Sequence, residues 1–145
     1  MHYIRELKLD DIDDVSNLEK SSGGIVTECL RDGTVPSFKA YGIYIKCDDG
    51  AMKVIGYCSC ESAEAVSSST YWSPTSLMIS EFFVDGEYRN QGYGTELMEY
   101  VLHEIPNTIA VFINADNINN LEWYKRFGFS NLVDGSIVKP EKIIE

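Results

Sequence analysis

A short stretch between two apolar segments combines the residue types that hold phosphate groups. It runs Val84-Asp-Gly-Glu-Tyr-Arg89-Asn-Gln-Gly92-Tyr-Gly94-Thr. Arg89 is the only lysine or arginine in residues 54–124 of a chain with 23 acidic and 12 basic residues. Gly92 and Gly94 lack Cβ atoms, which lets a ligand touch the main chain. We therefore expect an anion such as pyrophosphate to bind here, on main-chain N–H groups and the Arg89 guanidinium.

The elements around this stretch support that expectation. Ile79, Phe82, Phe83 and Val84 are β-branched or aromatic and lie in a run with the length of a strand. The residues after Gly94 predict an amphipathic helix, whose first N–H groups lack partners and whose dipole adds about half a positive charge. The Walker and Gly-x-Gly-x-x-Gly phosphate-binding motifs are absent. The alternative interpretation of this segment is a plain strand, turn and helix without a ligand. The apolar stripe of the predicted helix consists of Leu97, Met98, Val101, Leu102 and Ile105.

A second segment suited to a ligand follows another predicted strand, Ile109 to Ile113. It runs Asn114-Ala-Asp-Asn117-Ile-Asn-Asn120-Leu-Glu-Trp123-Tyr124-Lys-Arg-Phe-Gly128-Phe129. Asp116 or Asn117 is expected to cap a helix here, and Gly128 to end it. Asn117 and Tyr124 are two turns apart and therefore share one helix face.

Together the two segments resemble the motifs of the GNAT superfamily of N-acetyltransferases, which use acetyl-CoA. The first matches the pyrophosphate loop of that family, and the second matches its Asn, aromatic-Tyr and Gly-Phe motif. The resemblance covers residues 81–129, with both motifs in the family's order and spacing. Two positions depart from the pattern: Gly86 stands where proline is common, and Asn120 where alanine is usual.

The resemblance implies the acyl-CoA N-acyltransferase fold, an α/β (α+β) architecture with a mixed, mostly antiparallel twisted sheet flanked by helices. We expect one N-acetyltransferase domain over residues 1–145, which is long enough to bury about 70% of its unfolded surface. A hairpin is expected at Asp48-Asp-Gly50. The other predicted strands are Tyr3–Leu7, Tyr41–Lys46, Met52–Ser59 and Ile137–Val138, and the other predicted helices are Asp10–Lys20 and Ile25–Arg31.

The resemblance also implies which residues bind acetyl-CoA, as co-substrate. A splayed strand would offer main-chain groups of Phe83 and Val84 to the pantetheine arm and the thioester carbonyl. Asn117 would steady the same arm, unless it is only a helix cap. The full predicted set is Phe83, Val84, Arg89, Asn90, Gln91, Gly92, Tyr93, Gly94, Thr95, Asn117, Asn120 and Tyr124.

Acetyl transfer from a thioester requires a free amine, a polarised carbonyl and a proton for the departing thiolate. The resemblance implies Tyr124 as the general acid, and a phenol with a pKa of about 10 is protonated at neutral pH. The alternative is a tyrosine at the rim of the core. Glu81 is the candidate general base because apolar neighbours raise the pKa of a carboxylate. Its alternative is a solvent-exposed strand glutamate; Glu61 and His103 are weaker candidates, with His103 expected on the outer helix face.

The composition of the chain limits the classes of partner that are expected. A net charge of −11 favours a cationic amine and disfavours nucleic acid, whose phosphates it repels. Asp10, Asp11, Asp13 and Asp14 either steer substrate or form a solvated face. No apolar run reaches the length of a membrane span, and the N-terminus lacks a signal-peptide core, so no membrane partner and a cytoplasmic location are expected. The four cysteines have no metal-site spacing, and Cys58-x-Cys60 predicts buried, reduced thiols.

Three functions are compatible with these observations. The first is an acetyl-CoA-dependent N-acetyltransferase, in which a small cationic primary amine attacks the thioester directly in a ternary complex. The second has the same chemistry with a lysine side chain or a protein N-terminus as acceptor. The third is a non-catalytic acyl-CoA-binding regulatory module. The sequence leaves the acyl length open, and also whether the protein forms a homodimer.

Overall fold

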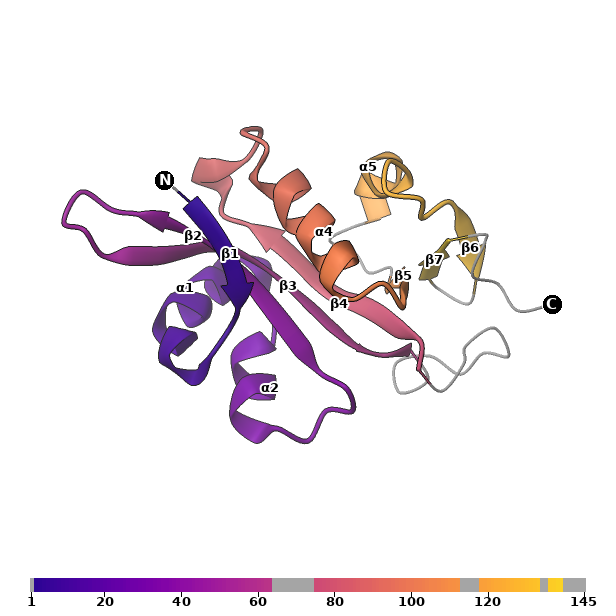
Figure 1. Cartoon of the computed structure of the whole chain (residues 1–145), viewed down its shortest axis with the longest axis horizontal. Helices are drawn as coiled ribbons and strands as arrows, with labels where there is room; N and C mark the ends of the chain where they lie inside the picture. The colour runs from indigo at the N-terminus through magenta and orange to yellow at the C-terminus, as the bar shows by residue number, and fades with distance from the viewer. Residues whose placement is uncertain (1, 64–74, 113–117, 134–135, 140–145) are drawn as a thin grey trace.

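The computed structural model describes residues 2–63, 75–112, 118–133 and 136–139 (Figure 1). Its strands form one sheet in the order β1-β2-β3-β4-β5-β7-β6, in which only the β4–β5 pair is parallel. The predicted fold class, a mixed and mostly antiparallel sheet flanked by helices, is confirmed. The strands are β1 (His2–Glu6), β2 (Lys39–Lys46), β3 (Met52–Ser62), β4 (Leu77–Val84), β5 (Thr108–Phe112), β6 (Asn131–Val133) and β7 (Ser136–Val138). The helices are α1 (Ile12–Ser22), α2 (Val26–Asp32), α4 (Tyr93–Glu104) and α5 (Leu121–Lys125), with short 3₁₀ turns at Leu9–Asp11, Gly86–Tyr88 and Ile118–Asn120.

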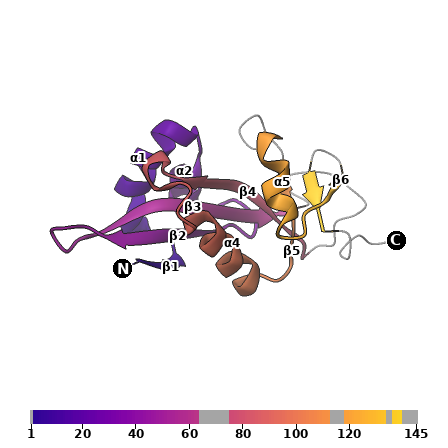
Figure 2. The same cartoon turned by 90° about the horizontal axis from the view of Figure 1, so that it is seen from above.

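The helices cover both faces of the sheet. Figure 2 shows α1 and α2 on one side and α4 on the other. Side chains alternate between the two faces along each strand, so neighbouring strand residues enter different cores. Those against α1 and α2 are Ala40, Tyr44, Val54 and Tyr57, with Val15, Leu18 and Val26 from the helices. Those on the opposite face include Tyr41, Ile43, Cys58, Cys60 and Ile79, with Leu97, Met98 and Val101 from α4.

Helix α4 confirms the predicted apolar stripe. Leu97, Met98 and Val101 are fully buried, and each contributes about 1.5–3 kcal/mol by leaving water. His103 lies on the outer face, where its side chain is 89% exposed, as expected. Burial of one face therefore fixes which side of α4 meets the sheet.

Both predicted ends of the last helix are wrong in detail, and one short strand was not predicted. Helix α5 starts at Leu121 with Asn120 at its N-cap, because a 3₁₀ turn over Ile118–Asn120 comes first. The predicted cap at Asp116 or Asn117 is therefore misplaced for this helix, and both residues lie outside the described ranges. The helix ends at Lys125, and Gly128 takes a φ of 97° beyond the C-cap Arg126. Strand β6 was not predicted, since a three-residue strand is too short to show alternation.

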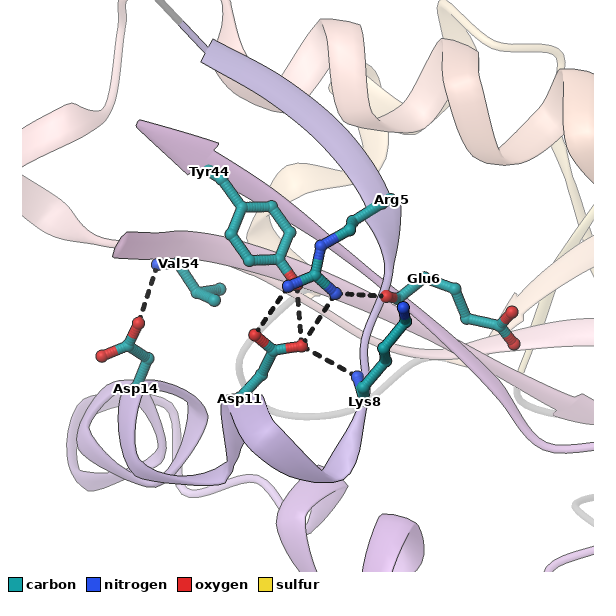
Figure 3. Close-up of polar contacts among 7 residues, drawn as sticks. All are labelled: Arg5, Glu6, Lys8, Asp11, Asp14, Tyr44 and Val54. Carbon is teal, nitrogen blue, oxygen red and sulfur yellow. Dashed lines mark hydrogen bonds and ion pairs between the residues drawn. The ribbon is translucent and has the colours of Figure 1, made fainter. Parts of the chain in front are cut away.

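A network of hydrogen bonds fastens the start of α1 to the sheet (Figure 3). The Asp11 carboxylate accepts two bonds of 3.0 Å from the Arg5 guanidinium, one of 3.0 Å from the Tyr44 hydroxyl and one of 2.8 Å from the Lys8 N–H. Burial alone would raise the pKa of Asp11, but these donors outweigh it and hold the pKa below 3.8. One turn on, Asp14 accepts a 3.1 Å bond from the Val54 N–H. Two of the four clustered acids therefore hold the helix in place.

The cysteine prediction is confirmed. Cys29, Cys58 and Cys60 are buried, Cys47 is partly buried, and all four are free thiols. Burial raises the pKa of Cys58, and the neighbouring Cys60 raises it further. Within the described residues, no group of three or more His, Cys, Asp and Glu side chains is placed to hold a metal ion. None of the described helices is long and apolar enough to cross a membrane.

Candidate active site

A cleft of about 700 Å³ opens where β4 and β5 separate. The two strands pair at Leu77–Thr108, Met78–Ala110 and Ile79–Val111. Beyond Ile79, β4 continues to Val84 with β3 as its strand partner among the described residues. The volume lies in the range of small-molecule and cofactor sites. Its wall includes the whole of β4 from Ile79 onward, the loop before α4, the start of α5 and the end of α1. The lining residues are Ser21, Ser22, Tyr57, Ile79, Ser80, Glu81, Phe82, Phe83, Val84, Tyr88, Arg89, Asn90, Gly92, Gly94, Thr95, Val111, Asn120, Trp123, Tyr124 and Arg126.

The glycine loop forms one end of this cleft. Asn90 and Gly92 have φ values of 62° and 89°, so the backbone turns through the left-handed region twice before α4 begins. Gly94 lies in the first turn of α4. A Cβ there would sit 3.6 Å from Trp123, 3.7 Å from Phe82 and 3.7 Å from Val84, which are ordinary contacts. Packing within the protein does not require a glycine at this position, so its missing side chain leaves space on the cleft side.

Arg89 is held at the same end by β4. Its Nε donates a 2.8 Å hydrogen bond to the Val84 carbonyl, and its guanidinium lies 5.1 Å from the centre of the Phe83 ring. That bond uses one of the five N–H donors of a guanidinium. The side chain is therefore anchored beside the first turn of α4, with its charge at the cleft.

Tyr124 lies on the opposite wall and is only 3% exposed. Its neighbour Trp123 packs against Phe82 at 5.2 Å, against Tyr124 at 5.1 Å and against Phe127 at 4.8 Å between ring centres. The contact with Phe82 packs α5 against β4, and Tyr124 lines the cleft beside it. The residue is both a core tyrosine and a lining residue.

Glu81 lies in the middle of β4 and faces the loop between α1 and α2. One carboxylate oxygen, Oε2, accepts a 3.2 Å hydrogen bond from the Ile25 N–H. Burial raises the pKa of Glu81, the Ile25 bond opposes that rise, and the charges of Glu19 and Glu61 add to it. The direction expected from the sequence is therefore confirmed, although like charges add to the effect of burial.

A tyrosine that the sequence did not single out lies beside this carboxylate. Tyr57 is fully buried on β3, and its hydroxyl is 2.5 Å from the Ser22 hydroxyl at the end of α1. Burial raises the pKa of Tyr57, and the charges of Glu81 and Glu19 raise it further. The sequence analysis did not point to this contact. The segment Ser21-Ser-Gly-Gly24 has residues that break a helix, but such a pattern does not indicate what the turn contacts.

Most of the predicted site residues come together in the cleft. Two of them, Gln91 and Tyr93, do not line it. Gln91 donates to the Glu87 carbonyl at 3.2 Å, and the ring of Tyr93 packs against Tyr88 and His2 at 6.3 and 5.2 Å. Asn117 lies outside the described residues, and its role stays a prediction. The predicted residues that line the cleft are Glu81, Phe83, Val84, Arg89, Asn90, Gly92, Gly94, Thr95, Asn120 and Tyr124.

Family comparison agrees with this geometry. Residues 12–129 match the model of the acetyltransferase (GNAT) family. The chain belongs to the GNAT acetyltransferase family. The suspected resemblance is thereby confirmed, and so is its consequence that the protein is an N-acetyltransferase, a class of enzyme that uses acetyl-CoA. Comparison with curated proteins gives no match.

Solved structures share the GNAT fold. The ribosomal-protein-S18-alanine N-acetyltransferase of Escherichia coli is 15% identical, with a TM-score of 0.65 over 92% of this chain and 80% of that one. The PaiA N-acetyltransferase of Thermoplasma acidophilum, solved in complex with coenzyme A, is 10% identical, with a TM-score of 0.61 over 95% and 96% of the two chains. At these identities the likeness concerns the fold alone.

A third similar structure is a KacTA–DNA complex, 18% identical, with a TM-score of 0.67 over 94% of this chain and 91% of that one. A chain of this fold therefore occurs in an assembly that contains DNA. The exclusion of nucleic acid for the present protein accordingly stays a prediction.

Proposed function

We propose that residues 1–145 form one N-acetyltransferase domain that transfers an acetyl group from acetyl-CoA to a small cationic primary amine. The amine would attack the thioester directly while both substrates are bound. One observation carries the proposal: a single cleft brings the glycine loop and start of α4 together with Glu81 and Tyr124. The free thiols suit a reducing compartment and support a cytoplasmic location.

The glycine loop fits a diphosphate. Helix α4 is 12 residues long and begins directly after two left-handed residues, so its first N–H groups are directed to the loop. Oxygen atoms of a diphosphate would accept bonds from these N–H groups and from Arg89, while the helix dipole favours their charge. The space beside Gly94 is consistent with close approach of the ligand to the main chain.

The part of β4 beyond its last described pair with β5 supports a seat for the pantetheine arm. Phe83 and Val84 lie beyond the last β4–β5 pair, and both line the cleft. Strand edges that lack a neighbour offer N–H and C=O groups to an extended ligand. Asn90, Thr95 and Asn120 would contact the same ligand from the loop, α4 and the start of α5.

Two side chains would move the protons of the reaction. Acetyl-CoA supplies an acetyl thioester when it is bound. Glu81 would accept a proton from the attacking nitrogen as the new C–N bond forms, which its raised pKa favours. Tyr124 would donate its phenolic proton to the sulfur as the C–S bond breaks.

The charges around Glu81 support a cationic acceptor. Glu19 and Glu61 are close enough to act on the Glu81 carboxylate, and the chain as a whole carries a net charge of −11. Such a field attracts ammonium groups and repels phosphates, so nucleic acid is not an expected partner. The second candidate acceptor is a polypeptide, which the name of the similar Escherichia coli enzyme favours.

Thiol release with acetyl-CoA tests the function directly. The acceptors would be 1,4-diaminobutane as a small cationic amine, an alanine-terminated peptide and a lysine peptide. We expect 1,4-diaminobutane to give the largest kcat/KM, because acidic side chains surround Glu81. A larger value for either peptide would replace the small-amine acceptor by a polypeptide, and no release with any amine would contradict the proposal.

Calorimetry with coenzyme A tests the diphosphate seat. Arg89→Glu should weaken binding at least about tenfold, because it replaces a charge-assisted donor by a repelling carboxylate. Arg31→Glu makes the same change of net charge on α2 and is the matched control. Equal affinities for the two variants would remove Arg89 from the seat.

Tyr124→Phe tests the proposed acid. Turnover should fall about 10²-fold, the lower end of the range for general acid catalysis, while coenzyme A affinity stays within about twofold. Tyr100→Phe removes a hydroxyl from α4 outside the cleft and controls for loss of a phenol. Wild-type turnover in Tyr124→Phe would exclude this tyrosine as the proton donor.

A further inference from the structure

The loop between α1 and α2 makes an unusually close contact with Glu81. Gly24 lies against the Glu81 carboxylate and the Tyr57 hydroxyl, and the next residue, Ile25, donates its N–H to Glu81 Oε2 at 3.2 Å. Ser22, two residues before Gly24, holds the Tyr57 hydroxyl and accepts a 3.1 Å bond from the Gly24 N–H. Two consecutive residues of this turn, Gly24 and Ile25, therefore contact the Glu81 carboxylate, and Ser22 holds the tyrosine beside it.

A side chain at position 24 would occupy the same space as this carboxylate. A Cβ built on Gly24 would overlap Oε1 of Glu81, and it would lie 2.7 Å from the Tyr57 hydroxyl and 3.0 Å from Cδ of Glu81. The backbone of Gly24 is outside the left-handed region, unlike that of Gly23, whose φ is 71°. Its conformation is thus open to any residue, and the glycine is required by the space that Glu81 takes.

We propose that Gly24 is a positioning residue, whose missing side chain lets the α1–α2 loop hold the Glu81 carboxylate at the wall of the cleft. The inference rests on the proposed function, in which Glu81 accepts the proton of the amine. Without this contact, a glutamate has three side-chain torsions and turns freely into solvent. With it, Oε2 is fixed on the Ile25 N–H, so the carboxylate keeps one orientation toward the attacking nitrogen.

The steric argument predicts what a methyl group would do. The two atoms closer than 3.0 Å, Glu81 Oε1 and the Tyr57 hydroxyl, are the ends of side chains, and the carboxylate is the nearer one. Gly24→Ala should therefore move the carboxylate and leave the fold intact. A displacement of about 1 Å lowers turnover by about 10²-fold when a proton acceptor must meet its substrate. Gly24 is not among the residues that line the cleft, so coenzyme A affinity should be unchanged.

A double-mutant cycle tests the inference with acetyl-CoA and 1,4-diaminobutane, or the peptide that gives more thiol release. Glu81→Asp withdraws the carboxylate by one methylene and relieves the closer of the two contacts, which leaves the one with the Tyr57 hydroxyl. We therefore expect Gly24→Ala to lower kcat about 10²-fold in the wild-type background and less than about threefold in the Glu81→Asp background. Equal losses in both backgrounds, or no loss in either, would overturn the inference.

A neighbouring glycine provides the control. A Cβ at Gly23 meets nothing within 4 Å, and asparagine tolerates its left-handed φ, so Gly23→Asn changes the same loop without touching Glu81. Its kcat should remain within about twofold of wild type. A loss as large as that of Gly24→Ala would show that any change in the loop is harmful and would overturn the positioning role.

Two further results separate the possible failures. A crystal structure of Gly24→Ala should show the carboxylate detached from the Ile25 N–H; an unmoved carboxylate overturns the inference. If Gly24→Ala is unfolded but the double variant with Glu81→Asp folds, the collision is confirmed; if both are unfolded, the backbone itself needs the glycine and the inference fails. If Glu81→Gln retains wild-type turnover, it is the proposed base that fails.

Discussion

Two carboxylates near α1 have opposite surroundings. Asp11 is 8% exposed and receives hydrogen bonds from Arg5, Tyr44 and the Lys8 N–H. Glu81 is partly buried and receives a main-chain bond from Ile25, and no ion pair involves it among the residues that the structure describes. The pKa of Asp11 is lowered and that of Glu81 is raised.

The comparison shows that a neighbouring cation determines whether a partly desolvated carboxylate is ionised. Burial disfavours the charged form at both positions, but the Arg5 guanidinium reverses the outcome at Asp11. Ionised Asp11 therefore stabilises the fold. At Glu81 burial and the charges of Glu19 and Glu61 all disfavour ionisation, so the group is suited to accept a proton.

The largest effect is expected from Glu81→Gln. Turnover should fall at least about 10²-fold, or about 3 kcal/mol in the barrier, because an amide does not accept the proton. The wild-type rate should rise with pH as Glu81 loses its proton, at a pH above the ordinary pKa of 4.5, and this limb should vanish in the variant. Kinetics of wild type and Glu81→Gln from pH 4 to 9 would check both the loss of turnover and the loss of the limb. A limb that is unchanged in Glu81→Gln would show that it reflects ionisation of the amine or of water.

The same variant should not reduce stability. Because the pKa of Glu81 is raised on folding, its contribution is fully present below the unfolded pKa and is lost as the pH rises through the folded value. Glutamine keeps an acceptor for the Ile25 N–H and has no charge to desolvate. Its free energy of unfolding at pH 7 should therefore equal or exceed that of wild type, and a clear loss would contradict the comparison.

Asp11→Asn should have the opposite consequences. The free energy of unfolding should fall by about 2 kcal/mol, because Arg5 and Tyr44 lose their charged acceptor in a partly buried site. Folded protein should keep wild-type turnover. Asp13→Asn on the exposed side of α1 is the matched control, and urea unfolding provides the measurement.

The pH dependence of that loss follows from the lowered pKa. The stabilisation by Asp11 is fully present above 3.8, the ordinary pKa of an aspartate, and is lost as the pH falls through its lower folded value. The difference between wild type and Asp11→Asn should therefore shrink below pH 4. A difference that stayed constant down to pH 2 would exclude the Asp11 charge as its cause.

The smallest effect is expected from Glu19→Gln. Removing this charge should lower the pKa of Glu81 and move the limb of the pH–rate profile slightly to lower pH, because solvent screens the interaction between the two carboxylates. The amide can still accept the bond that Glu19 takes from the Thr27 N–H at 3.3 Å. Glu99→Gln on the exposed face of α4 is the control. A shift to higher pH would contradict the assigned cause.

Local sequence patterns predicted most of the elements and most of the cleft. The stripe on α4 follows from its 3.6-residue period, and the glycine loop from its position between a strand and a helix. The start of α5 was placed too early, because an asparagine at several neighbouring positions fits a helix cap equally well. Strand β6 was not predicted because three residues are too few to show a periodic pattern. Its pairing with β7, at Leu132–Ile137 for example, is seen only in the structure.

The sequence by itself determined the family motifs, the order of the elements and the apolar faces, since these depend on residues close together in the chain. Only the tertiary structure decided the partners of the two carboxylates. Asp11 meets Tyr44, and Glu81 meets Ile25 and Tyr57, across 33, 56 and 24 positions of the chain. Which side chains meet depends on the register of the strands, including the register shift between Ile43 and Tyr44 in the β2–β3 pair, and on the packing of the α1–α2 loop. Such long-range contacts leave no periodic trace in the sequence, and they decide whether a carboxylate stabilises the fold or is left to accept a proton.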